Sequence, residues 1–288
     1  ALSGKMKELK AVQDKVADLD KKCSETMEQK QKLDDQQKQT QQRLNNAEKL
    51  TSLLGSEQVR WTEDSKTLGI KLDNLVGDVF LSAACISYYG PFTGVWRNEC
   101  VKGWMERMRE LKLPIGEDFS LQSSLGKPTD IRQWNIDGLP TDAVSIDSAV
   151  VVERAERYPL MIDPQSQANN WIKTMYKKDD MIITTFRNPK LLPTLETAVS
   201  NGRPMLIEDL DESVDASIDP VLLKQTREQV GGGKMLRLGD NEVNWDPGFK
   251  LFMTTKLPNP HYMPEICIKV TLLNFTVTQD GLEDQLLG

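Results

Sequence analysis

Asp163, Pro164, Gln165 and Gln167 occupy the position where an α/β module would carry a phosphate-binding loop. The preceding apolar residues 160–162 predict a short buried strand, and the residues after Gln165 predict a helix with one apolar face. In a working loop of this kind, glycine N–H groups close around phosphate and a Lys-Ser/Thr pair completes the site. This stretch has neither the glycines nor the Lys-Ser/Thr pair.

Two of these residues also act against phosphate binding. Pro164 has no backbone N–H to donate, and the carboxylate of Asp163 would repel a phosphate group. The sequence therefore predicts a scaffold like that of a P-loop NTPase in which the phosphate-loop position is degenerate. We expect no nucleotide cofactor in this segment.

Acidic residues follow a second apolar strand, predicted at 204–207. Glu208 and Asp209 come directly after it, in the place of the Walker B acids that hold Mg²⁺ and orient water. The expected order is Asp then Glu, and here it is reversed. Without a phosphate cradle to deliver a nucleotide, we expect a degenerate Walker B position at Glu208 and Asp209 with a structural role.

Other candidates for chemistry are weaker. The run 231–234 reads Gly-Gly-Gly-Lys, but Met235 follows and a hairpin is predicted next, so a flexible turn is expected. His261 lies in a proline-rich loop without a nucleophile spaced for catalysis. The four cysteines are scattered and there is one histidine, which disfavours a metal site. We expect no catalytic residue and no metal ligand.

The overall charge limits the direct partners of this segment. A formal net charge of −7 and a pI near 5.0 argue against nucleic acid and anionic membrane as partners. The most apolar stretch, 75–92, is interrupted by Gly and Asp and is too short to span a bilayer. The chain begins within a predicted helix and lacks an initiator Met, so we expect a piece of a larger protein.

Residues 141–288 predict an α/β domain with a mainly parallel sheet, since strands and helices alternate. Strands are predicted at 149–152, 160–162, 181–186, 204–207, 249–255 and 268–275, and a hairpin at 234–245. Helices are predicted from Gln165, after Pro189, and from Pro220 to Gln229.

Residues 1–54 predict one helix about 80 Å long, because the stretch has no proline and a single glycine. A heptad places ten apolar residues on one seam, as in a coiled coil. The seam consists of Leu2, Leu9, Val12, Val16, Leu19, Cys23, Leu33, Leu44, Ala47 and Leu54. Its middle is polar between Cys23 and Thr40, which either fixes the partner and register or lets the register slide. The partner strand would be another copy or a segment before residue 1.

Residues 55–112 predict a helical unit. Gly55 is expected to end the long helix, and further helices are predicted at 57–89 and 92–111 around the Gly90-Pro91 stop. Trp61, Trp96 and Trp104 fall at helical spacing, which is typical of a core rather than a binding platform. The sequence of residues 113–140 is rich in Pro and Gly and predicts a linker with a domain boundary. This composition continues to about residue 145.

Several longer peptides carry a family resemblance. They are Gly138-Leu-Pro-Thr-Asp142, Pro159-Leu-Met-Ile-Asp-Pro-Gln165, Gln167-Ala-Asn169, Trp171-Ile-Lys173, Thr254-Thr-Lys-Leu-Pro-Asn-Pro-His261, Val270-Thr-Leu-Leu-Asn-Phe275 and Gly281-Leu-Glu-Asp-Gln-Leu-Leu-Gly288. In this order they closely resemble dynein heavy chains over essentially the whole chain. The endings 269–275 and 281–288 resemble the axonemal type, of the outer-arm group.

The resemblance implies an architecture. Residues 1–54 resemble the returning strand of the antiparallel stalk, 55–112 the end of the helical part of the fourth AAA+ module, and 141–288 the large part of the fifth. The fifth module of the family similarly lacks a working phosphate loop, and the catalytic residues and ATP with Mg²⁺ belong to other modules.

The implied function is mechanical coupling between the ATPase ring and the microtubule-binding stalk tip of an axonemal motor in a cilium or flagellum. The implied partners are the opposing stalk strand, neighbouring AAA+ modules and other dynein chains, with microtubules contacted only through the tip. Two alternatives stay open: a module that turns over ATP through an atypical loop, and a homodimeric coiled-coil scaffold.

Overall fold

The computed structural model describes residues 2–229, 232–277 and 282–283, without the side chains of residues 2–14 and Ser56. The chain divides into two compact units, Ala1–Ile70 and Lys71–Gly288. The domain limits expected from the sequence, after residues 54, 112 and 140, stay predictions.

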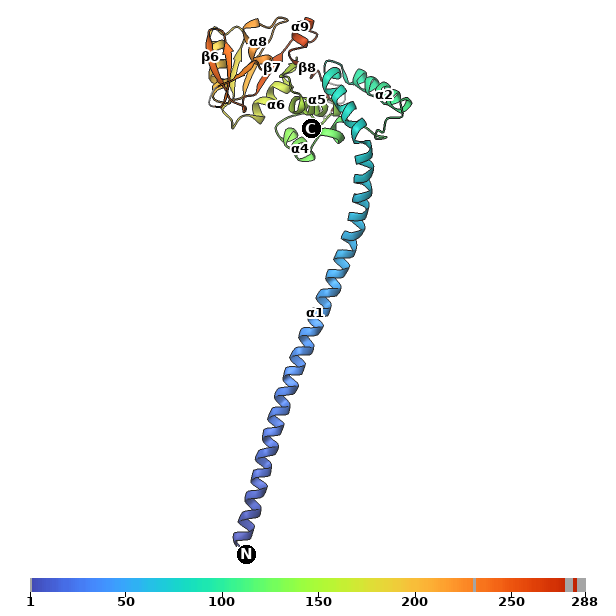
Figure 1. Cartoon of the computed structure of the whole chain (residues 1–288), viewed down its shortest axis with the longest axis vertical. Helices are drawn as coiled ribbons and strands as arrows, with labels where there is room; N and C mark the ends of the chain where they lie inside the picture. The colour runs from blue at the N-terminus through green and yellow to red at the C-terminus, as the bar shows by residue number, and fades with distance from the viewer. Residues whose placement is uncertain (1, 230–231, 278–281, 284–288) are drawn as a thin grey trace. The chain divides into compact units, whose positions relative to one another are not determined.

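The long helix α1 (Leu2–Ala84) does not end at Gly55 (Figure 1). It runs through Gly55, Gly69 and Gly77 and passes into the π-helix η1 (Cys85–Tyr89). A glycine inside a helix costs only about 1 kcal/mol relative to alanine, and helix propagation is cooperative, so the flanking turns carry the helix across. The predicted break at Gly55 is therefore wrong.

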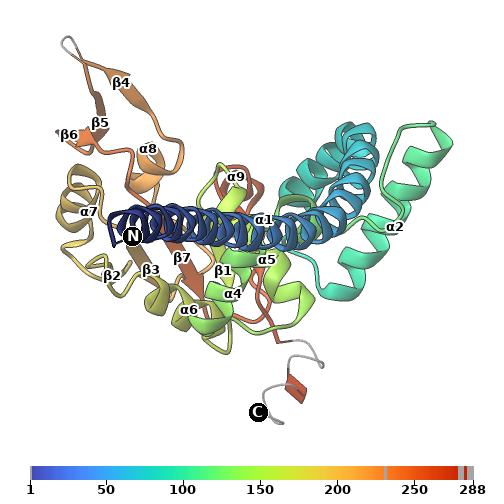
Figure 2. The same cartoon turned by 90° about the horizontal axis from the view of Figure 1, so that it is seen from below.

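The predicted α/β fold with a parallel sheet is confirmed. Its strands are β1 (Pro159–Ile162), β2 (Ile182–Thr185), β3 (Met205–Glu208), β7 (Leu251–Thr255) and β8 (Thr271–Asn274). They are all parallel, in the order β2-β3-β7-β1-β8. Figure 2 shows β2, β3, β7 and β1 following one another across the sheet. This order places the carboxyl ends of β1, β3 and β7 along one edge.

Side chains that alternate along the strands build one core on each face of the sheet. On the first face, Leu160 and Ile207 pack with α7 (Leu191–Ser200) and α8 (Asp219–Leu222). On the other face, Met161 and Leu206 pack with side chains of the helices α4, α5 and α6. These helices are α4 (Pro128–Ile136), α5 (Ala143–Arg154) and α6 (Gln167–Met175). The short elements η2 (Ala216–Ile218) and α9 (Pro264–Cys267) complete the connections.

A small antiparallel sheet joins the first face. It contains β4 (Thr226–Glu228), β5 (Lys234–Leu238) and β6 (Asn241–Trp245), in that order. The predicted hairpin is confirmed, but the helix predicted for 220–229 ends at Leu222. The following residues pair with β5 instead, because the buried side chains of Leu236 and Val243 anchor this sheet to the core.

The expected linker contains helices. It contains α3 (Leu121–Leu125), α4 and the beginning of α5. The strand predicted at 149–152 is wrong as well, because these residues lie inside α5. The Asp142 carboxylate accepts the Ser145 N–H at 3.0 Å and caps the helix, and Ala149, Val150 and Val151 are buried. Tertiary burial overrides the strand preference of the valines.

The helix α2 (Gly94–Glu110) was predicted, but part of its expected core is exposed. Met105 and Met108 are buried, whereas Trp96 is 61% exposed. Trp61 on α1 is 60% exposed as well. No described residue of this chain covers either indole, so the core prediction is wrong for these two and holds in part for the half-buried Trp104.

Arg97 fastens the turn between η1 and α2 to the sheet. Its buried guanidinium donates to the carbonyl oxygens of Gly90 (2.8 Å) and Asn274 (3.2 Å) and to Ser148 Oγ (2.9 Å). The Asn274 N–H also donates to the Gly90 carbonyl at 2.9 Å. Gly90 is required here, because a Cβ would lie 2.4 Å from the Leu272 carbonyl oxygen. These contacts hold the helical segment against β8 and α5.

Candidate functional site

The expected phosphate-loop and Walker B positions meet at the carboxyl ends of β1, β3 and β7. Asp163 follows β1, Glu208 ends β3, and Thr254 lies near the end of β7. In open α/β sheets this edge is where ligands bind. The register of β1 with β7 and of β3 with β7 fixes the three positions relative to one another.

Asp163 lies at the start of α6, where a working loop would hold phosphate. Its side chain is buried, Oδ1 accepts the N–H of Gln167 at 2.8 Å, and Oδ2 accepts the N–H of Asn169 at 2.8 Å. Both donors belong to the first turn of α6, whose N–H groups would hold phosphate in a working loop. These two donors are therefore bonded to a carboxylate of the chain itself.

Burial raises the pKa of Asp163 above its ordinary value, although the N–H groups of Asn169 and Gln167 partly oppose the shift. The turn around it is tight. Ser166 has a φ of +62°, and its N–H donates to the Asp163 carbonyl at 3.2 Å. Pro164 and Gln165 span this turn, and the helix begins only at Gln167.

Glu208 is held by α6. Its Oε1 lies 2.5 Å from Lys173 Nζ and accepts from the Asn169 side-chain amide at 2.7 Å. The same amide lies 3.3 Å from Thr254 Oγ1. Asn169 therefore connects the two positions, because its backbone N–H donates to Asp163 and its side-chain amide donates to Glu208. The carboxylate that would orient an attacking water is instead committed to an ion pair.

Three further acidic residues near this edge make ion pairs or a hydrogen bond. Asp209 has a φ of +52° and pairs with Lys256 at 2.9 Å on the surface. Asp211 pairs with Arg187 at 3.3 Å, also on the surface. The Glu212 carboxylate accepts the backbone N–H of His261 at 3.1 Å.

The other two candidates from the sequence, His261 and the described glycines of the run 231–233, belong to loop segments. His261 is exposed, and its imidazole makes no hydrogen bond among the described residues. Gly231 of the glycine run lies outside the described residues, whereas Gly232 and Gly233 have positive φ angles and lead into β5. The glycines thus precede a strand rather than a helix, as the turn interpretation expects.

Asn169, Lys173 and Thr254 were missed as site residues in the sequence. One signal was present, since Asn169 and Lys173 are four residues apart and so share a helix face. That this face meets Glu208 depends on the position of β3 relative to α6, which the sequence alone does not give.

Three features of this edge of the sheet bear on nucleotide binding. The N–H groups at the start of α6 are bonded to Asp163, Pro164 has no N–H, and the acid at Glu208 is neutralised by Lys173. No group of three or more potential metal ligands occurs among the described residues. None of the described helices combines the length and hydropathy needed to cross a bilayer.

The seam residues of α1 are exposed wherever their side chains are described. Val16 is 52%, Leu33 65% and Leu54 53% exposed, and Leu19, Cys23, Leu44 and Ala47 are exposed as well. The side chains of Leu2, Leu9 and Val12 lie outside the described ones. The structure thus places the predicted seam along one helix without a partner strand among the described residues.

Two sequence families match this chain. One, described as the ATP-binding dynein motor region, matches residues 132–288. The other, described as the microtubule-binding stalk of the dynein motor, matches residues 1–108. Both matches agree with the order of elements, a long helix followed by an α/β module.

Curated relatives give the same result. Human dynein axonemal heavy chain 6 is 43% identical over 97% of this chain, and human dynein axonemal heavy chain 3 is 44% identical over all of it. Human dynein axonemal heavy chain 1 is 41% identical over 97% of the chain. The chain spans only about 7% of the length of the first two relatives and 6% of the third. Their names state no arm, so the outer-arm assignment stays a prediction.

Proposed function

This chain belongs to the axonemal dynein heavy chains, and we propose that it is a non-hydrolysing mechanical link between the stalk and the ATPase ring of such a motor. It is a dynein motor region that joins stalk sequence to an AAA module. The axonemal class places it in a cilium or flagellum.

The single observation that carries the non-hydrolysing role is the hydrogen bonding of Asp163. Its two oxygens accept the N–H groups at the start of α6, so the chain supplies its own anion at the phosphate position. The Glu208–Lys173 ion pair supports the same role, because the lysine competes with water for this carboxylate. ATP with Mg²⁺ is therefore proposed to act in other modules of the heavy chain.

The mechanical role rests on how the last turns of α1 are fastened within Lys71–Gly288. Asp78 Oδ1 accepts the Gly116 N–H at 3.0 Å, and Ser82 Oγ contacts Ser124 Oγ at 2.9 Å. A Cβ on Gly77 would lie 2.0 Å from the Pro114 carbonyl oxygen, so the helix backbone is closely packed at this point. Together with Arg97, these contacts form a continuous path from helix to sheet.

The exposed seam of α1 supports the proposed partner on the stalk side. A row of apolar side chains that is open along a long helix is stabilised by a second helix. We propose that this partner is the opposing stalk strand of the same heavy chain, and that the microtubule is contacted only at the stalk tip. Neighbouring AAA+ modules and other dynein chains are the remaining proposed partners.

A substitution in the full heavy chain tests the non-hydrolysing role. In a working module, an acid that orients the attacking water or holds Mg²⁺ is needed for hydrolysis, so its replacement by Gln should abolish hydrolysis. Here Glu208→Gln should leave the steady-state ATPase rate of the heavy chain within about twofold of the unmodified rate, less than about 0.5 kcal/mol in activation free energy. Lys173→Met breaks the same ion pair without changing the acid and is the matched control. A tenfold loss in Glu208→Gln alone would contradict the proposal, whereas equal losses in both would indicate a structural effect.

Register movement of the stalk is tested at Cys23, which is exposed on the seam side of α1. Cysteines placed at successive positions of the opposing strand are oxidised in each nucleotide state of the full heavy chain. We expect the preferred crosslinking partner to change between states, because the polar middle of the seam loses little burial when it shifts. One partner in all states would reject sliding.

Sedimentation distinguishes the homodimeric scaffold from the proposed stalk role. Analytical ultracentrifugation of the chain at increasing concentration would show a stable dimer if the α1 seam pairs with a second copy. The stalk role predicts no stable dimer, because the matching strand is a different segment of the heavy chain.

A further inference from the structure

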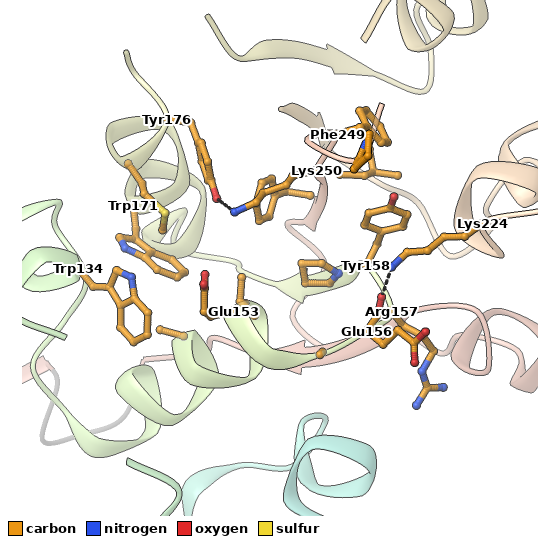
Figure 3. Close-up of a pocket in the computed structure, with 18 of the residues that line it drawn as sticks. Trp134, Glu153, Glu156, Arg157, Tyr158, Trp171, Tyr176, Lys224, Phe249 and Lys250 are labelled. Carbon is orange, nitrogen blue, oxygen red and sulfur yellow. Dashed lines mark hydrogen bonds between the residues drawn. The ribbon is translucent and has the colours of Figure 1, made fainter. Parts of the chain in front are cut away.

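A cavity of about 360 Å³ lies at the opposite end of the sheet from the nucleotide position. It is formed where β1 and β7 begin, between Tyr158-Pro159 and Phe249-Lys250, and by the end of α6 at Tyr176 (Figure 3). Asp163 and Glu208 follow the other ends of their strands and do not line it. Its size is within the range of small-molecule sites.

Aromatic rings form most of its wall. Trp134 and Trp171 meet edge to face with centroids 6.1 Å apart, and Tyr176 packs on Phe252 at 5.2 Å. On the other side, Phe249 packs edge to face against Tyr158 at 6.1 Å. Flat apolar walls of this kind hold a planar ring by stacking and edge contacts.

Two lysines bring positive charge to these walls. Lys250 Nζ donates to the Tyr176 hydroxyl at 3.1 Å and lies 5.5 Å from the Tyr176 ring centroid. Lys224 Nζ donates to the Glu156 carbonyl at 2.6 Å and lies 5.1 Å from the Tyr158 ring centroid. Figure 3 shows the two side chains entering from different elements, with their amino groups toward the aromatic rings.

Neither lysine is neutralised by a close carboxylate. Among the described residues, every ion pair within 4.0 Å involves other lysines and arginines. The carboxylate of Glu153 is an exposed group of the wall, beyond that distance from both lysines, and Glu156 contributes its carbonyl. Within hydrogen-bond distance the two lysines contact only neutral oxygens, and Glu153 and Asp179 act on Lys250 from farther away. In a chain with a net charge of −7, two cations without a close carboxylate at an aromatic cavity form a local site for an anion.

The wall also contains an unused donor. The Trp171 side chain is 1% exposed, and its Nε1–H has no hydrogen-bond partner among the described residues. A buried donor without an acceptor costs free energy, and a polar ligand atom or a water molecule would satisfy it.

We propose that this cavity binds a small aromatic anion, with the ring between the Trp171 and Tyr158 sides and the carboxylate or sulfonate within reach of Lys250 or Lys224. The aromatic walls supply the apolar contact area, and the lysines select a negatively charged ligand over a neutral one of the same shape. The site is independent of the proposed mechanical function, because it uses none of the residues at the nucleotide position.

The probe for the test is indole-3-acetate, and indole-3-ethanol is its neutral counterpart of similar size. Ligand-observed NMR with the whole chain measures the dissociation constant of each. We expect saturable binding of indole-3-acetate that is at least tenfold tighter than that of indole-3-ethanol. Lys250→Met or Lys224→Met keeps the apolar stem and should remove most of this preference.

Two further variants complete the experiment. Lys177→Met removes an exposed charge just beyond α6 that does not line the cavity, and it should leave both constants unchanged. Val152→Phe extends a wall residue and should weaken both probes, with folding followed by thermal unfolding. Equal affinity for the two probes, no saturable binding, or the same effect from Lys177→Met as from Lys250→Met would overturn the proposal.

Discussion

Asp147 should make the stability of the compact unit depend on pH in a defined direction. It lies on α5 beside Tyr89 and Arg97, and its Oδ1 has no hydrogen-bond partner among the described residues. Burial raises the pKa of Asp147 from its ordinary 3.8 to about 6, although the Arg97 guanidinium partly opposes the shift. The folded state therefore holds a proton here that the unfolded chain has already released.

The sign follows from proton linkage. A carboxyl group whose pKa is raised by folding is neutral in both states well below pH 3.8, so it costs nothing there. As the pH rises toward about 6, the charged form becomes favoured in the unfolded chain first, and stability falls. Above this window the loss reaches about 3 kcal/mol, at about 1.4 kcal/mol for each pKa unit.

The perturbation is Asp147→Asn, which removes the titration at nearly constant shape. Urea unfolding followed by tryptophan fluorescence should show that the variant gains stability over the unmodified chain as the pH rises. From about pH 5 to about pH 7.5 this gain should grow by about 1.5 kcal/mol. Glu153→Gln, an exposed acid on the same helix, is the control and should show no such trend. A difference that stays constant with pH, or that shrinks as the pH rises, would refute the reasoning.

The joint between the helical segment and the sheet yields two further predictions, each read by urea unfolding. Gly90→Ala should destabilise the chain by about 2 kcal/mol, because the new Cβ meets the Leu272 carbonyl, whereas Gly103→Ala has open space and should stabilise it by about 0.5 kcal/mol. The first prediction fails if the two variants are equally stable. Arg97→Met should cost at least about 3 kcal/mol through the carbonyls it leaves unpaired, whereas the exposed Arg107→Met should change stability by less than about 0.5 kcal/mol. A loss below about 1 kcal/mol for Arg97→Met would show that the guanidinium does not hold the joint.

The sheet was predictable because its central strands are buried on both faces. Runs such as Leu160-Met161-Ile162 and Met205-Leu206-Ile207 are continuously apolar, which is typical of parallel strands covered by helices. The end of α7 near Gly202 was predictable as well, since its φ of +64° favours glycine.

The errors in the fold arose where tertiary contacts decided the local structure. The valines of 149–152 have a strand preference but are buried inside a capped helix, and residues 226–228 form a strand only because β5 pairs with them. Gly55 did not end α1, because a single glycine is too weak a signal against a long cooperative helix.

The candidate site was predictable in part. The missing glycines and the acid at Asp163 led to the prediction that phosphate does not bind, and this stays a prediction. That Asp163 itself accepts the N–H groups of Gln167 and Asn169 required the geometry of the turn. The pairing of Glu208 with Lys173 required the position of β3 beside α6 and could not be read from spacing along the chain.

The proposed non-hydrolysing role depends most on the claim that the chain's own carboxylate occupies the phosphate position. Titration of the chain with a fluorescent ATP analogue and Mg²⁺ tests this claim most directly. We expect no saturable binding up to millimolar nucleotide, where a site would contribute about 4 kcal/mol or less of binding free energy. A micromolar dissociation constant, reversed by unlabelled ATP and changed by substitution of Asp163, would contradict it.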